Sequence, residues 1–404
     1  MIGIAIRIGQ RMGIHSETSL AKCSVFEAEM RRRLWWSLVL FDSRIGEMAS
    51  YKAMTLTPTW DCRVPLNVSD SDLREHMKEP PAAHERATEA LFPVLRSKLG
   101  EFIRNDPSHL EFYNPALKAI AKELPAGGDA AVFESIIEEQ YLRFCDPAIP
   151  SHFMTIWVTR GRLAKYRLVE RYSKFSKSAA EQTDAQRDAA ISYALRMVEC
   201  DTKIMTSPLT QGFLWLAHMH FPFPAYIHLT QSLKRRPLSE RARQAWEMMS
   251  DNHEARSGLV RMADGPFYGI FANFVLQAWE ACEVAFRQSS DPIATPRIIL
   301  QIRHTLAQMA PDANVSGAGQ SHGSANMDGQ GLSMSTMMVD SSNPPHGMGN
   351  QPSYAMGSSP FPDMPDLDLL GFDANQLAWP GMDWDVFTAP NGTIGLIQEP
   401  SMPY

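Results

Sequence analysis

The stretch RRRLWWSLVLFDSR, from Arg31 to Arg44, places three arginines before an apolar run that contains one carboxylate, Asp42. Apolar residues recur there at spacings of four, four, three and four, which puts them on one face of a helix. That face consists of Met30, Leu34, Leu38, Phe41 and Ile45. Apolar residues also flank and oppose it, so we expect the helix to lie inside the domain. The side chains expected to be largely buried are Leu34, Trp35, Leu38 and Phe41.

The charged residues of this helix allow more than one interpretation. Arg31, Arg32 and Arg33 are consecutive, so a helix directs them about 100° apart and they do not form one basic stripe for nucleic acid. Paired or solvated charge is therefore favoured, with a nuclear import signal as the alternative. Asp42 falls beside the core face, where an unpaired carboxylate is costly. We expect it to have an arginine partner, either from another helix or from Arg44.

The first 305 residues have helical apolar spacing throughout, and no hairpin signal appears among them. We therefore predict an all-α class, with a multi-helix regulatory domain at 1–305. Further helices are expected at Pro81–Arg104, Phe133–Phe144, His152–Phe175, Ala179–Met205, Leu209–Leu233, Ser239–Met262 and Ile270–Arg287.

Sites for catalysis or metal binding are hard to find in this sequence. Its five cysteines lie far apart, as expected of free thiols in a reducing compartment. His218 and His220 diverge on a helix, and prolines separate them from His228, so packed histidines are favoured over a metal site. His253 and Glu254 are adjacent and do not face each other on a helix. No nucleophile elbow or phosphate-binding loop appears, and no run is apolar enough to span a membrane.

The tail differs sharply from the body in composition and charge. From His304 to Tyr404 there are nine aspartates, one glutamate and no lysine or arginine. We predict a disordered Gly/Ser/Met/Pro-rich linker at 306–360 and an acidic-aromatic activation segment at 361–404. Its apolar side chains would enter a partner's groove; they are Leu369, Leu370, Phe372, Trp379, Trp384 and Phe387. A low-complexity tail without a partner is the alternative.

The Arg31–Arg44 stretch resembles the signature helix of the fungal-specific transcription factor domain, the helical middle region of fungal zinc binuclear cluster regulators. The residues that match the signature are Arg32, Arg33, Leu34, Trp35, Trp36, Ser37, Leu38 and Asp42. Flanking motifs agree with it, namely Gly13, Ile14 and His15 before the helix and Pro65, Asn67, Asp70 and Asp72 after it. The resemblance extends over about residues 1–290. The glycine-arginine-proline that often follows the signature is absent, with Tyr51, Lys52 and Ala53 near that place.

The resemblance implies a transcription regulator that acts in the nucleus, activates transcription and is not an enzyme. It also implies that the family's domain begins in this chain without its usual opening helices. The six spaced cysteines of a zinc cluster do not occur in these 404 residues, so we expect zinc and DNA contact only through a module outside them. Expected partners are transcriptional coactivators at the tail and a dimer mate, either a second copy or a related regulator, with no membrane. The alternatives are a cluster-less modulator of a full-length relative, and a helical small-molecule-binding protein or enzyme.

Overall fold

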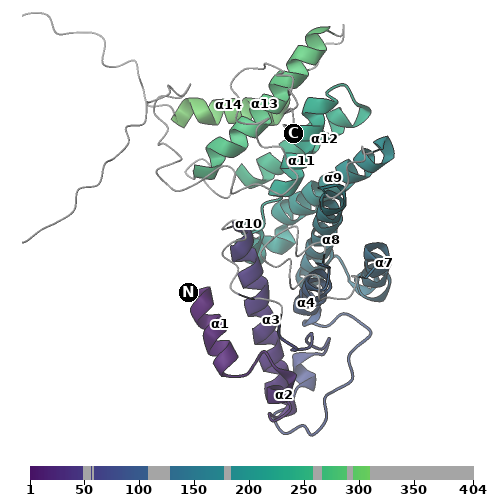
Figure 1. Ribbon diagram of the computed structural model, residues 1–404, viewed down its shortest axis with the longest axis vertical. Coiled ribbons are helices and arrows are strands. Elements are labelled where there is room, and N and C mark those ends of the chain that lie inside the picture. The colour runs from purple at the N-terminus through teal and green to yellow at the C-terminus, as the bar shows by residue number, and fades with distance from the viewer. Residues whose placement is uncertain are drawn as a thin grey trace, which may run out of the picture. The chain divides into compact units, whose positions relative to one another are not determined.

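The computed structural model describes residues 1–48, 56, 59–107, 128–176, 183–257, 266–288 and 294–309 (Figure 1). Every regular element in these ranges is an α-helix or a short 3-10 helix and no strand occurs in them, which confirms the predicted all-α class. The described residues up to Thr305 belong to one compact unit. The predicted linker is wrong at its start, because residues 306–309 form the end of a helix rather than a disordered segment. The predicted linker from residue 310 onward and the whole acidic segment lie outside the described residues.

Helices α1 (Ile2–Arg11), α2 (Glu17–Leu20) and α3 (Val25–Met48) open the chain, and α1 packs beside α3 (Figure 1). Gly13 turns the chain between α1 and α2 with a φ of +69°, a conformation that favours glycine. Ser24 marks the start of α3, because its Oγ accepts a hydrogen bond from the backbone N–H of Glu27 at 3.2 Å. The short 3-10 helix η1 (Asp70–Asp72) follows α3.

Helix α4 (Leu91–Arg104) packs against both α3 and α8 (Pro150–Ser176), while α7 (Ala130–Gln140) and η3 (Leu142–Phe144) lie between them in the sequence. The Asp129 carboxylate caps α7 by accepting from the backbone N–H groups of Ala131 and Val132. The helix expected from Pro81 begins ten residues later, at Leu91. The physical reason is that the carbonyls of His84 and Arg86 bind a side-chain amide instead of continuing a helix.

Helix α9 (Asp184–Thr206) runs along α8 and also contacts α11 (Phe223–Arg235) and α12 (Glu240–Ser257). Thr183 caps α9 through a reciprocal pair of hydrogen bonds with Gln186. The single helix expected over Leu209–Leu233 is divided into η4 (Pro208–Phe213), α10 (Leu214–His218) and α11. Pro222 separates the last two, because proline removes a helical N–H donor.

Helices α13 (Pro266–Gln288) and α14 (Arg297–Met309) close the described part of the chain, and α11 packs against α13. Helix α13 covers the predicted Ile270–Arg287 segment. Helix α14 was not among the predicted helices, and it follows Pro296, a residue that suits the start of a helix.

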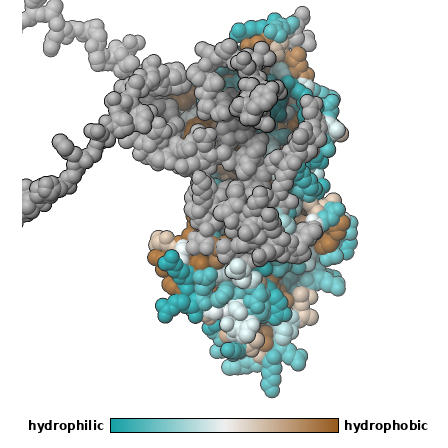
Figure 2. All heavy atoms as spheres, viewed as in Figure 1, coloured by the Kyte–Doolittle hydropathy of each residue, from teal (hydrophilic) through white to brown (hydrophobic). Residues whose placement is uncertain are grey.

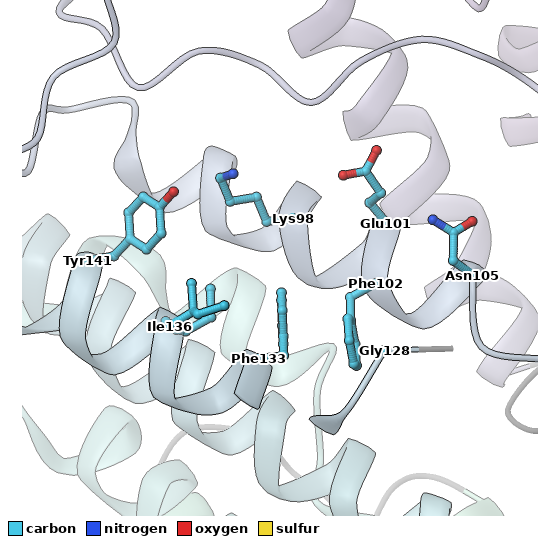
Figure 3. Close-up of a pocket in the computed structure, with 9 residues that line it drawn as sticks. Lys98, Glu101, Phe102, Asn105, Gly128, Phe133, Ile136 and Tyr141 are labelled. Carbon is cyan, nitrogen blue, oxygen red and sulfur yellow. The ribbon is translucent and has the colours of Figure 1, made fainter. Parts of the chain in front are cut away.

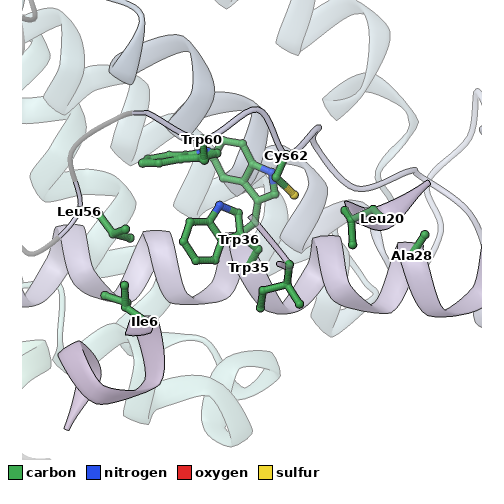
Figure 4. Packing of buried hydrophobic residues seen from close by; sticks show 9 residues of the cluster. Ile6, Leu20, Ala28, Trp35, Trp36, Leu56, Trp60 and Cys62 are labelled. Atoms are coloured by element: carbon green, nitrogen blue, oxygen red, sulfur yellow. The ribbon is translucent and has the colours of Figure 1, made fainter. Parts of the chain in front are cut away.

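The hydrophobic core around the opening helices is centred on Trp35 and Trp36 of α3 (Figure 4). Both side chains are almost fully buried, at 0% and 1% exposure. The cluster also contains Ile6, Ile14, Leu20, Ala28, Leu56, Trp60 and Cys62. Two further clusters join α4 to α7 and α8, and α8 to α9 and α10.

The predicted core face of α3 is wrong in part. Leu34 is 49% exposed, and Met30 and Ile45 are also exposed, while Leu38 and Phe41 are half-buried. The side that is buried instead carries the two tryptophans and Leu40. Because α3 is apolar on nearly every side, its periodicity could not show which face the rest of the chain would cover.

Candidate functional site

The two tryptophans of α3 are held by a third, Trp60, which comes from the segment after the helix (Figure 4). Their ring centroids lie 5.9 Å and 6.3 Å from that of Trp60, both in edge-on geometry, which favours aromatic pairs. The indole N–H of Trp36 donates to the carbonyl of Arg63 at 2.9 Å. The signature tryptophans therefore fix this segment against α3, a packing role rather than a chemical one.

Arg32 of the signature binds Glu17 of α2 with two hydrogen bonds, of 2.9 Å from Nε and 2.7 Å from Nη2. The backbone N–H of Arg63 also donates to Glu17, at 2.9 Å. Burial would raise the pKa of the Glu17 carboxyl, but the hydrogen bonds from Arg32 and Arg63 outweigh it and lower the pKa to about 2. This carboxylate thus joins α2, α3 and the segment near Trp60.

Arg33 reaches a different carboxylate, that of Asp70 in η1, with Nη1 and Oδ1 2.7 Å apart. On its own helix it also contacts Glu29, whose side chain is only 1% exposed. Glu29 accepts a hydrogen bond from the backbone N–H of Leu66 at 3.0 Å. Arg31, by contrast, pairs with Glu27 one turn away. The arginines are therefore paired, as predicted, and each has its own main carboxylate.

Asn67, from the motif that follows the signature helix, is 5% exposed and crosslinks two segments. Its amide donates to the carbonyls of His84 and Arg86, both at 2.8 Å, and its oxygen accepts from the Thr88 hydroxyl at 2.7 Å. Asp72 contacts the His84 imidazole at 2.7 Å. The hydrogen bonds of this motif therefore hold in place the segment that leads into α4.

Asp42 is 2% exposed, as its place beside the core predicted. One of its oxygens accepts a hydrogen bond from the backbone N–H of Leu56 at 3.1 Å. Arg44, the partner considered from the sequence, turns instead to Glu47 and to the backbone carbonyl of Met219. Ser37 is exposed, and its hydroxyl donates to the Arg33 carbonyl within the helix. These signature residues therefore serve folding.

A cavity of about 300 Å³ lies between α4 and α7 (Figure 3). Phe102 and Phe133 stack at its floor with ring centroids 4.0 Å apart. Polar groups at its edge include Lys98, Glu101 and Asn105. The lining residues that the structure describes include no serine, cysteine or histidine, and the volume of the cavity is at the lower end for ligand pockets.

His220 and His228 each contact a side chain of α8: His220 contacts Arg162, and His228 contacts Tyr172. No group of residues within the described ranges could hold a metal ion. All five cysteines are free. Burial raises the pKa of Cys62 and Cys200 to about 12, which keeps both thiols protonated and weakly nucleophilic.

Sequence reasoning missed three residues of this site, Glu17, Glu29 and Trp60. Glu29 had a signal, because it precedes Arg32 and Arg33 by three and four residues, the spacing of helical ion pairs. Glu17 and Trp60 had none, since both reach α3 across long sequence separations. The predicted activation residues cannot be placed in this site, because they all lie outside the described ranges: Leu369, Leu370, Phe372, Trp379, Trp384 and Phe387.

The family model of the fungal specific transcription factor domain matches residues 1–117. These residues contain the tryptophan cluster, the paired arginines and the hydrogen bonds of Asn67. Residues 1–117 are thus similar in sequence to a fungal specific transcription factor domain. This confirms the resemblance drawn from the signature between Arg32 and Asp42.

Relatives extend the similarity to most of the chain. It is 46% identical over 400 residues to Transcriptional regulator AacuB of Aspergillus aculeatus, covering 96% of this chain and 54% of that protein. It is 42% identical over 396 residues to Transcriptional regulator nsrM of Aspergillus novofumigatus, covering 95% and 53% respectively. It is 29% identical over 328 residues to the Aurofusarin cluster transcription factor aurR2 of Gibberella zeae, covering 77% and 46%.

This chain therefore spans about half the length of these relatives. No solved structure matches it. Among the described residues, no helix has the length and hydropathy needed to cross a membrane.

Proposed function

We propose that this chain is the regulatory and activating part of a fungal transcription regulator that acts in the nucleus and is not an enzyme. The observation that carries this proposal is the 46% identity with a transcriptional regulator across 96% of the chain. Because so much of the chain is covered, the similarity takes in most of the residues after Met309 as well as the helical body. The signature residues support it, since the structure gives them packing and pairing roles rather than catalytic ones.

In this proposal the helical body folds and dimerises, and residues 361–404 activate transcription. The dimer mate would be a second copy or a related regulator, and the tail would bind transcriptional coactivators. DNA would be reached through a module outside these 404 residues. The opposite effect, in which the chain modulates a full-length relative, is the competing proposal.

A reporter assay tests the activating role. The full 404-residue chain is fused to a foreign DNA-binding module and compared with the same fusion lacking residues 361–404. We expect strong reporter expression from the first and little from the second. A silent full-length fusion that still binds a relative in a pull-down would favour the modulator instead.

The target genes form a second, finer proposal. One relative is named as the transcription factor of the aurofusarin cluster. We extend that class to this chain and expect it to regulate a contiguous set of biosynthetic genes. Transcript levels with and without the gene should differ most within one such set. Changes scattered over unrelated loci would contradict the extension.

A further inference from the structure

A second group of charged side chains lies where α3, α4, α8 and the turn before α11 meet. It contains Arg44, Glu47, Arg96, Arg162, Lys165 and His220. Arg44 and Arg96 come from the segment that matches the family model, whereas the residues of α8 and the turn do not. The group is distinct from the ion pairs of the signature arginines.

Glu47 binds two of the cationic side chains in this group. Its two carboxylate oxygens accept hydrogen bonds from Nη1 of Arg44 and Nζ of Lys165, both at 2.6 Å. Arg44 also donates from Nε to the backbone carbonyl of Met219. Burial would raise the pKa of Glu47, yet Lys165 and Arg44 lower it to about 2, so the carboxylate stays charged.

Arg162 and His220 form a second contact within this group. Nη2 of Arg162 lies 3.1 Å from Nε2 of His220, and a guanidinium can only donate in such a contact. His220 must therefore be neutral there, with Nε2 as the acceptor. Burial, together with the charges of Arg162, Arg44 and Arg96, holds the pKa of His220 far below its usual range.

Arg96 is the least satisfied member of the group. Its Nε is buried without a hydrogen-bond partner, and the contact that the structure gives its guanidinium is with the Phe92 ring, 5.4 Å from the centroid. Burial and the nearby Arg162 lower its pKa to about 9. A buried donor without a partner is destabilising, and more so when it carries a charge.

The charges of this group do not balance. The group contains four cationic side chains, of which Arg44 and Lys165 contact Glu47, and this carboxylate can neutralise one positive charge. Burial lowers the pKa of Arg162 and of Lys165, as expected where positive charges are crowded away from water. Such a cluster is costly when empty, and strongly perturbed cations in one place are a mark of functional sites.

We propose that Arg44, Arg96 and Arg162 form a binding site for a small anion that carries a carboxylate or phosphate group. Guanidinium groups match both head groups through paired hydrogen bonds. Lys165 adds charge, Glu47 holds Arg44 and Lys165 in place, and His220 orients Arg162. The anion would join α3 and α4 of the family domain to α8 and the turn before α11. This proposal is independent of the activating role of the tail.

Thermal unfolding of the full 404-residue chain tests the site, with inorganic phosphate or citrate added at constant ionic strength in chloride. We expect the Tm to rise with the concentration of at least one of them, and the more effective anion identifies the head group. The variants Arg162→Gln and Arg96→Met should weaken binding at least about ten-fold, the loss of one charge-assisted contact. Arg160→Gln is the matched control on α8, because Arg160 pairs with Glu138 and not with the group.

Arg96→Met also provides a readout without any anion. If Arg96 awaits a ligand, its removal relieves the unpaired buried Nε donor and the repulsion from Arg162, and the Tm of the empty variant should equal or exceed that of the wild type. A merely structural arginine would lower it. The proposal is overturned if neither anion stabilises the wild type, if Arg96→Met and Arg162→Gln respond like the wild type, or if Arg160→Gln loses the response equally.

Discussion

Nη1 of Arg33 lies 2.7 Å from Oδ1 of Asp70, which ties the signature helix to the motif that follows it. The two residues are 37 positions apart in the sequence, and each makes a second contact. Arg33 also contacts the buried Glu29, and the backbone N–H of Asp70 donates to Glu89 just before α4. Arg33 and Asp70 together thus connect α3, η1 and the segment just before α4.

The buried face of α3 can be tested with two identical substitutions on one helix. Leu40 is 7% exposed, whereas Leu34 is 49% exposed. Leu40→Ala should lower the free energy of unfolding by about 2 to 5 kcal/mol through the cavity it leaves. Leu34→Ala should cost less than about 1 kcal/mol. Urea denaturation of both variants gives the comparison, and equal losses would contradict the assignment of the faces.

Much of the fold was predictable because helices rest on local periodicity. The ranges predicted for α8 and α13 agree with the structure to within about four residues, as do the predicted end of α9 and the predicted start of α12. The predicted start of α9 and the predicted end of α12 lie outside the described residues. The prediction failed where a distant side chain replaced the local pattern. Asn67 binds the carbonyls of His84 and Arg86, so the chain there does not become the first turns of α4. The residues next to residue 84 in the sequence do not reveal these hydrogen bonds with Asn67.

The site was predictable only as far as local spacing reaches. The pairing of Arg31 with Glu27 follows from a four-residue spacing. The contacts of Trp35 with Trp60 and of Arg32 with Glu17 depend on how separate segments fold back on α3. The cationic group around Glu47 was missed for the same reason, since its members lie on four segments between residues 44 and 220.

The pKa of Glu17 predicts an acid sensitivity with a defined sign. The folded pKa of about 2 lies below the ordinary 4.5, so the unfolded chain binds more protons between those values. Stability should therefore fall as the pH falls through this window, and Glu47 adds to the effect with its own low pKa. Urea unfolding between pH 7 and pH 3 measures it. Glu17→Gln should be less stable than the wild type at pH 7 and should lose less on acidification.

The buried pair of Asp201 on α9 and Arg256 on α12 should be a major point of stability. Nε of Arg256 lies 2.7 Å from Oδ2 of Asp201, and both side chains are under 10% exposed. Asp201→Ala leaves an unpaired buried charge and should cost about 3 to 5 kcal/mol in urea denaturation. Asp184→Ala, at an exposed pair on the same helix, should cost less than about 1 kcal/mol. Adding Arg256→Met to Asp201→Ala should recover part of the loss, and a further loss would contradict this account.

The paired arginines predict weak DNA binding by these 404 residues. Arg31, Arg32 and Arg33 are occupied by carboxylates of Glu27, Glu17 and Asp70, so they are not free to neutralise phosphates. Fluorescence anisotropy with random and promoter-derived duplexes should show weak binding without sequence preference, declining steeply with salt. Nanomolar, sequence-selective binding would show that another surface of the chain reads DNA.

The activation segment is tested by separating its aromatic residues from its acidic ones. If hydrophobic side chains enter a coactivator groove, Phe372, Trp379, Trp384 and Phe387 are the principal anchors, each worth about 2 kcal/mol or more when truncated. The aspartates keep them solvated and steer the encounter, so a single charge matters less. Replacing the four aromatics by alanine in a tethered Pro311–Tyr404 fragment should abolish reporter expression, while Asp373→Asn should only weaken it. Protein levels measured by immunoblot control for degradation. A fragment without its aromatics that activates like the wild type would leave the tail as low-complexity sequence with no coactivator to bind.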